Sequence, residues 1–165
     1  MKLKRWHLTT FLVAVLILVG LHWVSRTEFW LEWRTESMKA RIAESFAEDE
    51  SEYAVFAQQM RAHSTQGDYY AYYKNPSLSL PEELISQAEA FIDERGVPFD
   101  EMYKTGDNEI IYPKDACVFR CTIWAGKDVY CWVDLIHTGQ EDFFEENPVT
   151  TPLNSEWYIV VLYGY

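Results

Sequence analysis

The chain has 165 residues, of which 26 are acidic and 14 are basic, so its formal net charge at pH 7 is −12. A protein this acidic is repelled by nucleic-acid phosphates and by anionic lipids, which excludes nucleic-acid binding and favours a basic protein or a cation as the partner. The alternative that the charge leaves open is that it only keeps the protein soluble.

Residues 6–24 form a largely apolar segment that follows a basic N-terminus. A helix of this length spans about 28 Å, which is close to the hydrocarbon thickness of a bilayer. Trp6 and Trp23 lie at its two ends, where amphipathic rings prefer the headgroup layer. We therefore predict that residues 1–25 comprise a cytoplasmic basic tip and a single-pass transmembrane anchor.

The orientation of this anchor follows from the positive charges that precede it. Lys2, Lys4 and Arg5 lie on its N-terminal side. Positive residues favour the cytoplasmic side, so we expect a cytoplasmic N-terminus and an extracytoplasmic domain, either periplasmic or extracellular. A cleaved signal peptide is the alternative, but cleavage after Gly20 would place the large Leu18 where a small residue is needed.

Residues 26–63 are predicted to form a helix that leaves the membrane as a stalk or packs against the domain. They contain no glycine or proline. Asp49 followed by Glu52 resembles a capping box, which predicts a break near residues 48–52 and a second helix to about His63. An apolar stripe at helical spacing comprises Leu31, Met38, Ile42, Phe46, Tyr53, Phe56, Ala57 and Met60.

Two tryptophans, Trp30 and Trp33, come just after the anchor and lie off this stripe. One interpretation is that their rings rest on the lipid headgroups. The other is that they contact a second membrane protein. They are therefore candidate binding residues.

Residues 64–165 are predicted to form one acidic α+β domain. A helix is expected at residues 80–95, because Ser79 is a good N-cap and Gly96 can end the helix. The tyrosine-rich residues 69–73 predict a short strand or an extended cover, or a stacking surface for a carbohydrate or peptide.

Alternating apolar and polar residues predict a small antiparallel sheet of about three or four strands, with helices packed on one face. Residues 117–124 and 129–136 alternate on either side of a turn, which predicts a hairpin. Residues 157–165 are apolar on both faces, which is typical of a central strand. Residues 109–112 are expected to add a short strand.

The three cysteines of an exported domain predict a disulfide. Cys121 and Cys131 share the apolar face of the hairpin, and one allowed register places them directly opposite each other. The other register leaves them diagonal. We favour the first register, and therefore predict a Cys121–Cys131 disulfide with Cys117 as a buried free thiol.

The same strand face also carries His137, which raises the question of a metal site or a catalytic Cys–His pair. Cys117 and Cys121 stand roughly 13 Å apart along one strand, too far to share a zinc ion. Cys131 and His137 are about 20 Å apart, too far for a catalytic pair. The sequence carries no phosphate loop and no nucleophile elbow. We therefore expect no metal, no cofactor and no catalytic residue.

A further candidate binding site precedes Pro148, where two phenylalanines are surrounded by acidic residues. The spacing matches no calcium-binding loop. A solvated loop is one interpretation, and an apolar-centred acidic patch for a basic partner is the other. Its residues are Glu141, Asp142, Phe143, Phe144, Glu145 and Glu146.

These features predict a non-catalytic membrane protein whose acidic domain binds another protein, either basic or membrane-embedded. An accessory subunit of an envelope complex and an immunity-type inhibitor of a basic protein are two forms of this hypothesis. The alternative is a small envelope enzyme or ligand-binding domain, with a pocket between the sheet and helix 80–95.

Overall fold

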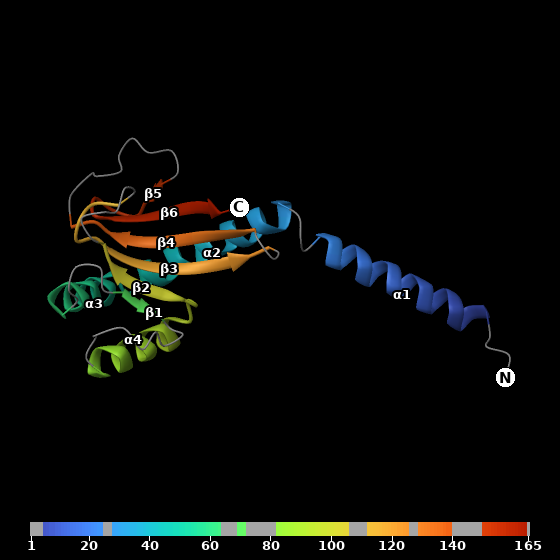
Figure 1. The fold of residues 1–165 in the computed structure, drawn as a ribbon, viewed down its shortest axis with the longest axis horizontal. Helices are drawn as coiled ribbons and strands as arrows, with labels where there is room; N and C mark the ends of the chain where they lie inside the picture. Colours follow the sequence, from blue (N-terminus) through green and yellow to red (C-terminus); the bar gives the residue numbers. More distant parts are fainter. Residues whose placement is uncertain are drawn as a thin grey trace.

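The computed structural model describes residues 5–24, 28–63, 69–71, 82–105, 112–125, 129–139 and 150–164 (Figure 1). Its helices are α1 (Arg5–Val24), α2 (Glu28–Glu48), α3 (Glu50–His63) and α4 (Glu82–Arg95). Its strands are β1 (Tyr69–Ala71), β2 (Glu101–Lys104), β3 (Cys117–Trp124), β4 (Tyr130–His137), β5 (Thr150–Pro152) and β6 (Trp157–Gly164).

The described strands form one antiparallel sheet in the order β1-β2-β3-β4-β6-β5, which confirms the α+β class. The sheet has six strands rather than the three or four predicted. β2 and β5 were missed because they are short, and β2 buries only Met102 fully. Tyr112 lies outside the strands, and the rest of the strand predicted at 109–112 falls outside the described residues.

α1 lies apart from the sheet and its covering helices (Figure 1). Side chains are described for residues 9–22 of this helix, and all of them are exposed. Its large apolar side chains range from 40% exposed at Val15 to 68% at Phe11. Among the residues that the structure describes, no helix combines the length and the apolar character needed to cross a membrane. The transmembrane part of the prediction therefore finds no support there.

The predicted break between two helices is confirmed at Asp49, which separates α2 from α3. Its carboxylate accepts the backbone N–H of Glu52 at 3.3 Å, the bond expected of an N-cap. Arg95, the last residue of α4, forms ion pairs with both Asp49 and Glu52. The C-terminal end of α4 therefore fixes the junction between α2 and α3.

α4 ends as predicted, at Gly96. This glycine has a φ of +62°, and its N–H bonds to the carbonyl of Ile92 at 3.0 Å. Such a left-handed residue after a helix is accommodated best by glycine. The predicted N-cap, Ser79, lies outside the described residues.

One hydrophobic core fills the space between the sheet and helices α2, α3 and α4. Phe119 of β3 lies at its centre, with ring centroids of five other aromatic residues within 5.6–6.1 Å. These residues are Tyr53, Phe56, Phe91, Phe99 and Trp157. α2 and α3 contribute to this core, so residues 28–63 pack against the sheet.

Candidate functional site

The layer of helices α2, α3 and α4 carries a large share of the acidic charge. Residues 28–63 and 82–95 contain 13 acidic and five basic residues, a net charge of −8. Several of the carboxylate side chains are exposed, and we call this set the acidic helical surface. Its members are Glu32, Glu44, Glu48, Glu83, Asp93 and Glu94.

The five basic side chains of the same layer are engaged within the domain. Each donates to a backbone carbonyl or to a carboxylate of the protein itself. The pairs are Arg34 with the carbonyl of Trp124, Lys39 with Glu36, Arg41 with the carbonyl of Gly96, Arg61 with the carbonyls of Asp115 and His137, and Arg95 with Asp49 and Glu52. The four arginines therefore tie the helices to other parts of the domain, while Lys39 pairs within α2 and the carboxylates dominate the surface.

A buried ion pair lies on the sheet face opposite the helices. Asp134 of β4 is fully buried, and Arg120 of β3 is its direct cross-strand neighbour. The guanidinium donates two hydrogen bonds to the carboxylate, at 2.9 Å and 2.7 Å. The hydroxyl of Tyr112 donates a third, at 2.5 Å. Burial and the Asp134 carboxylate raise the pKa of Tyr112 above its ordinary value, so the hydroxyl keeps its proton.

Aromatic rings enclose the other side of Arg120. Its guanidinium carbon lies 4.2 Å from the ring centroid of Trp132 and 5.2 Å from that of Tyr103. Burial alone would lower the pKa of Arg120, but the hydrogen bonds and charge of Asp134 hold it above the ordinary value. The described contacts saturate this network, which favours a role in stability.

The predicted Cys121–Cys131 disulfide is wrong, and all three cysteines are free. The register pairs Cys121 with Val133 and Cys131 with Ile123, so the two thiols are diagonal. The reason is the turn, which closes with the N–H of Ala125 bonded to the carbonyl of Val129 at 3.0 Å. A hairpin's turn sets its register, and closure one residue earlier on each strand would have placed the cysteines opposite each other.

Burial raises the pKa of all three thiols, to about 11 for Cys117 and well above the ordinary value for Cys121. We therefore expect no reaction with Ellman's reagent in the folded protein near pH 8, and reaction of three thiols per chain after denaturation. Time courses with and without guanidinium chloride measure this. A thiol that reacts rapidly in the folded protein would contradict the burial, and fewer than three after denaturation without reductant would indicate oxidation.

Cys117 and His137 are direct cross-strand neighbours, whereas the predicted register would have placed Leu135 opposite Cys117. The Cys117 thiol donates to the carbonyl of Ala57 at 3.2 Å, and the His137 Nε2 lies 3.0 Å from a Glu156 carboxylate oxygen. Burial lowers the pKa of His137 while it raises that of Cys117. Both shifts favour the uncharged forms, so the thiol is not activated as a nucleophile.

An open cavity of about 300 Å³ lies at the C-terminal end of α4. It is close to the place where the alternative prediction put a pocket between the sheet and helix 80–95. Its lining residues are Ile92, Asp93, Gly96, Val97, Pro98, Phe99 and Asp100. The Asp100 carboxylate already accepts the backbone N–H of Thr122. Within the described ranges, no cluster of three or more His, Cys, Asp or Glu side chains is arranged to hold a metal ion.

A group of aromatic residues gathers where α2 begins, and all of them are exposed except the half-buried Trp30. We call this set the aromatic end, and it comprises Phe29, Trp30, Trp33, Trp124 and Tyr163. Trp30 and Trp33, both selected from the sequence, are stacked with ring centroids 5.0 Å apart. Trp124 and Tyr163 come from β3 and β6. They were not predicted as candidate binding residues, because only the tertiary structure brings their strands to the start of α2.

The other predicted binding site, Glu141, Asp142, Phe143, Phe144, Glu145 and Glu146, lies outside the described residues. Its proposed role therefore stays a prediction.

The chain matches no known protein family, no curated protein and no solved structure.

Proposed function

We propose that this protein is a membrane-anchored binding protein without catalytic activity. In this proposal residues 6–24 hold the chain in a membrane, with the N-terminus in the cytoplasm. The acidic domain then binds a basic region of another protein on the extracytoplasmic side. An accessory subunit of an envelope complex and an immunity-type inhibitor of a basic protein are two forms of this function.

The exposed apolar surface of α1 supports the anchor. Phe11, Ile17 and Leu21 are each more than half exposed, at 68%, 56% and 62%. Apolar side chains gathered on one element in this way mark a surface that a membrane or another protein covers. The basic residues that precede the segment favour a membrane anchor with a cytoplasmic N-terminus.

The main support for the binding role is that the basic side chains of the helical layer are bonded within the domain, whereas many of its acidic side chains are exposed. Its basic side chains bond to carbonyls and carboxylates of the domain, while Glu44, Glu48 and Glu94 are exposed. A surface that carries charge of one sign accelerates and orients the approach of a partner that carries the opposite charge. This arrangement favours a basic protein as the partner.

A pair of glutamates on α2 offers a direct test by co-purification. We expect a tagged full-length protein, extracted in mild detergent, to retain a stoichiometric partner at low salt and to lose it at high salt. The double variant Glu44→Gln/Glu48→Gln should weaken capture, by up to about fivefold in affinity for each carboxylate at about 1 kcal/mol. Mass spectrometry identifies the partner and measures its stoichiometry.

The matched control is Thr151→Lys/Ser155→Lys, which changes the net charge equally at exposed positions outside the helical layer. This variant should retain the partner. A partner that survives high salt and is equally retained by both variants would contradict binding through the acidic helical surface. No partner at either salt concentration would contradict the binding function itself.

The open cavity beside α4 favours one alternative function, a ligand-binding domain. Its volume of about 300 Å³ is at the lower limit for small-molecule sites. Asp93 supplies an exposed carboxylate at its rim. A ligand screen by thermal shift, repeated with Asp93→Asn, tests this alternative independently of any protein partner.

A further inference from the structure

The start of α2 and the ends of β3 and β6, which carry the aromatic end, lie on the side of the domain to which α1 is attached (Figure 1). α1 ends at Val24 and α2 begins at Glu28, so the two Cα atoms are separated by at most about 15 Å of extended chain. Phe29, Trp30 and Trp33 occupy the first two turns of α2. A membrane that holds α1 therefore lies close to these side chains.

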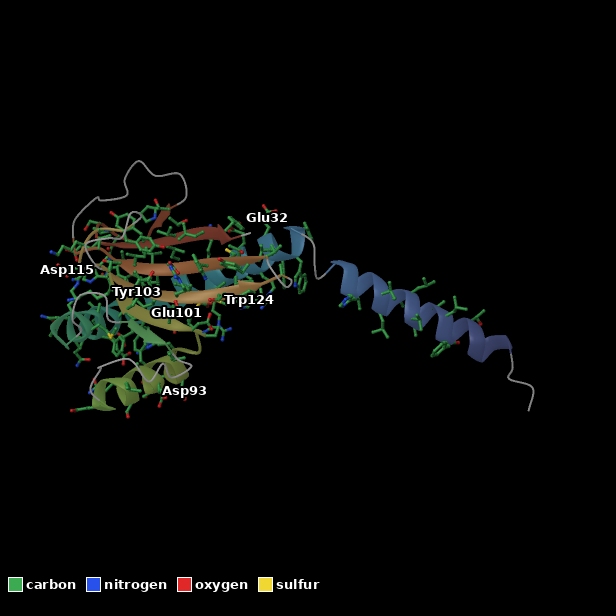
Figure 2. The ribbon with its side chains drawn as sticks, in the orientation of Figure 1. Glu32, Asp93, Glu101, Tyr103, Asp115 and Trp124 are labelled. Carbon is green, nitrogen blue, oxygen red and sulfur yellow. The ribbon has the colours of Figure 1, made fainter. Side chains whose placement is uncertain are left out.

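The ends of β3 and β6 lie beside the start of α2. Trp124 is the last residue of β3, and Tyr163 is the next-to-last residue of β6. Arg34 donates to the carbonyl of Trp124 at 3.4 Å, which ties the strand end to α2. Figure 2 shows Glu32 and Trp124 at this end of the domain. The aromatic side chains therefore come from three elements held together at one end.

These rings are exposed to a degree unusual for large aromatic residues. Phe29 is 71% exposed, Trp33 55%, Trp124 57% and Tyr163 50%. Three of the four are tryptophan or tyrosine, whose rings combine apolar area with a polar group and prefer the headgroup layer to the hydrocarbon core. Both the residue types and their position next to the anchor therefore indicate a headgroup layer.

We propose that the aromatic end lies in the headgroup layer of the membrane that holds α1, so that the domain is seated on the bilayer. This inference rests on the membrane anchor of the proposed function. Glu32, Arg34, Glu36 and Lys39 flank the aromatic residues and balance in charge. The contact therefore requires no anionic lipid and persists at high salt, unlike binding through the acidic helical surface.

Tryptophan fluorescence in vesicles of phosphatidylcholine tests the proposal on the full-length protein. The fluorescence of Trp124 is obtained by subtracting the spectrum of the Trp124→Phe variant from that of the wild type. We expect it to be largely quenched by lipid brominated near the headgroup end of the chain, and less by lipid brominated at mid-chain. We also expect little quenching by aqueous acrylamide. The exposed position makes Trp124→Phe a mild change, and thermal melting checks that the variant is folded.

The matched control is Trp157→Phe, because Trp157 is 2% exposed and lies at the opposite end of β6, roughly 23 Å from Gly164 at strand rise. Its difference signal should be unaffected by either brominated lipid. Flotation of the vesicles separates the two proposals. Protein that does not float contradicts the anchor, and this inference with it. If the protein floats, but Trp124 is quenched by acrylamide and not by brominated lipid, the anchor is retained. The proposal that the aromatic end lies in the headgroup layer is then wrong.

Discussion

Replacing Arg120 by methionine is expected to lower the free energy of unfolding by about 3–5 kcal/mol, because the buried carboxylate of Asp134 then loses its charged partner. The Asp134 side chain is 0% exposed, so water cannot take the place of the guanidinium. The hydroxyl of Tyr112 alone remains as a donor. Urea unfolding of the full-length protein in mild detergent, followed by tryptophan fluorescence, measures the loss.

Two comparisons identify the cause of that loss. The double variant Arg120→Met/Asp134→Leu should recover much of the stability, because removing both charges together leaves neither one buried alone. Glu101→Gln removes a second, partly exposed acidic neighbour of Arg120 at 3.6 Å and should cost less than about 1 kcal/mol. If Arg120→Met costs no more than Glu101→Gln, the buried-charge explanation is wrong.

Phe119→Ala is expected to destabilise the domain by about 3–5 kcal/mol. Phe119 is 1% exposed and its ring lies among five other aromatic rings of the core. Truncation removes their contacts and leaves a cavity between β3 and the helices, which the surrounding rings fill only partly. The same urea titration measures the change.

The matched control is Phe29→Ala, the same substitution at a side chain that is 71% exposed. It should change the stability by less than about 0.5 kcal/mol. Phe119→Leu, which keeps most of the volume, should cost roughly 1 kcal/mol. Equal losses for the two alanine variants would contradict the assignment of Phe119 to the centre of the core.

Local signals in the sequence predicted several elements correctly. The N-cap at Asp49, the helix end at Gly96 and the alternation around the β3–β4 turn each involve only a few neighbouring residues. Capping and strand alternation depend on backbone geometry within one or two turns. These features could therefore be recognised without knowledge of the fold.

The aromatic end was recognised only in part. Trp30 and Trp33 were visible as neighbours of the anchor, but Trp124 and Tyr163 lie about 90 and 130 residues further along the chain. Exposed aromatic residues at strand ends carry no periodic signal that marks them as a site. Their membership depends on which strand ends the packing of α2 places beside them.

Composition and local periodicity were enough to predict the α+β class, the apolar N-terminal segment, the acidic charge and the limits of the longer helices and strands. The pairing of the strands was needed to establish that Cys121 and Cys131 are diagonal, that Cys117 faces His137, and that Arg120 pairs with Asp134. The physical reason is that a shift of one residue on each strand at the hairpin turn re-pairs every cross-strand neighbour while it leaves the apolar pattern unchanged.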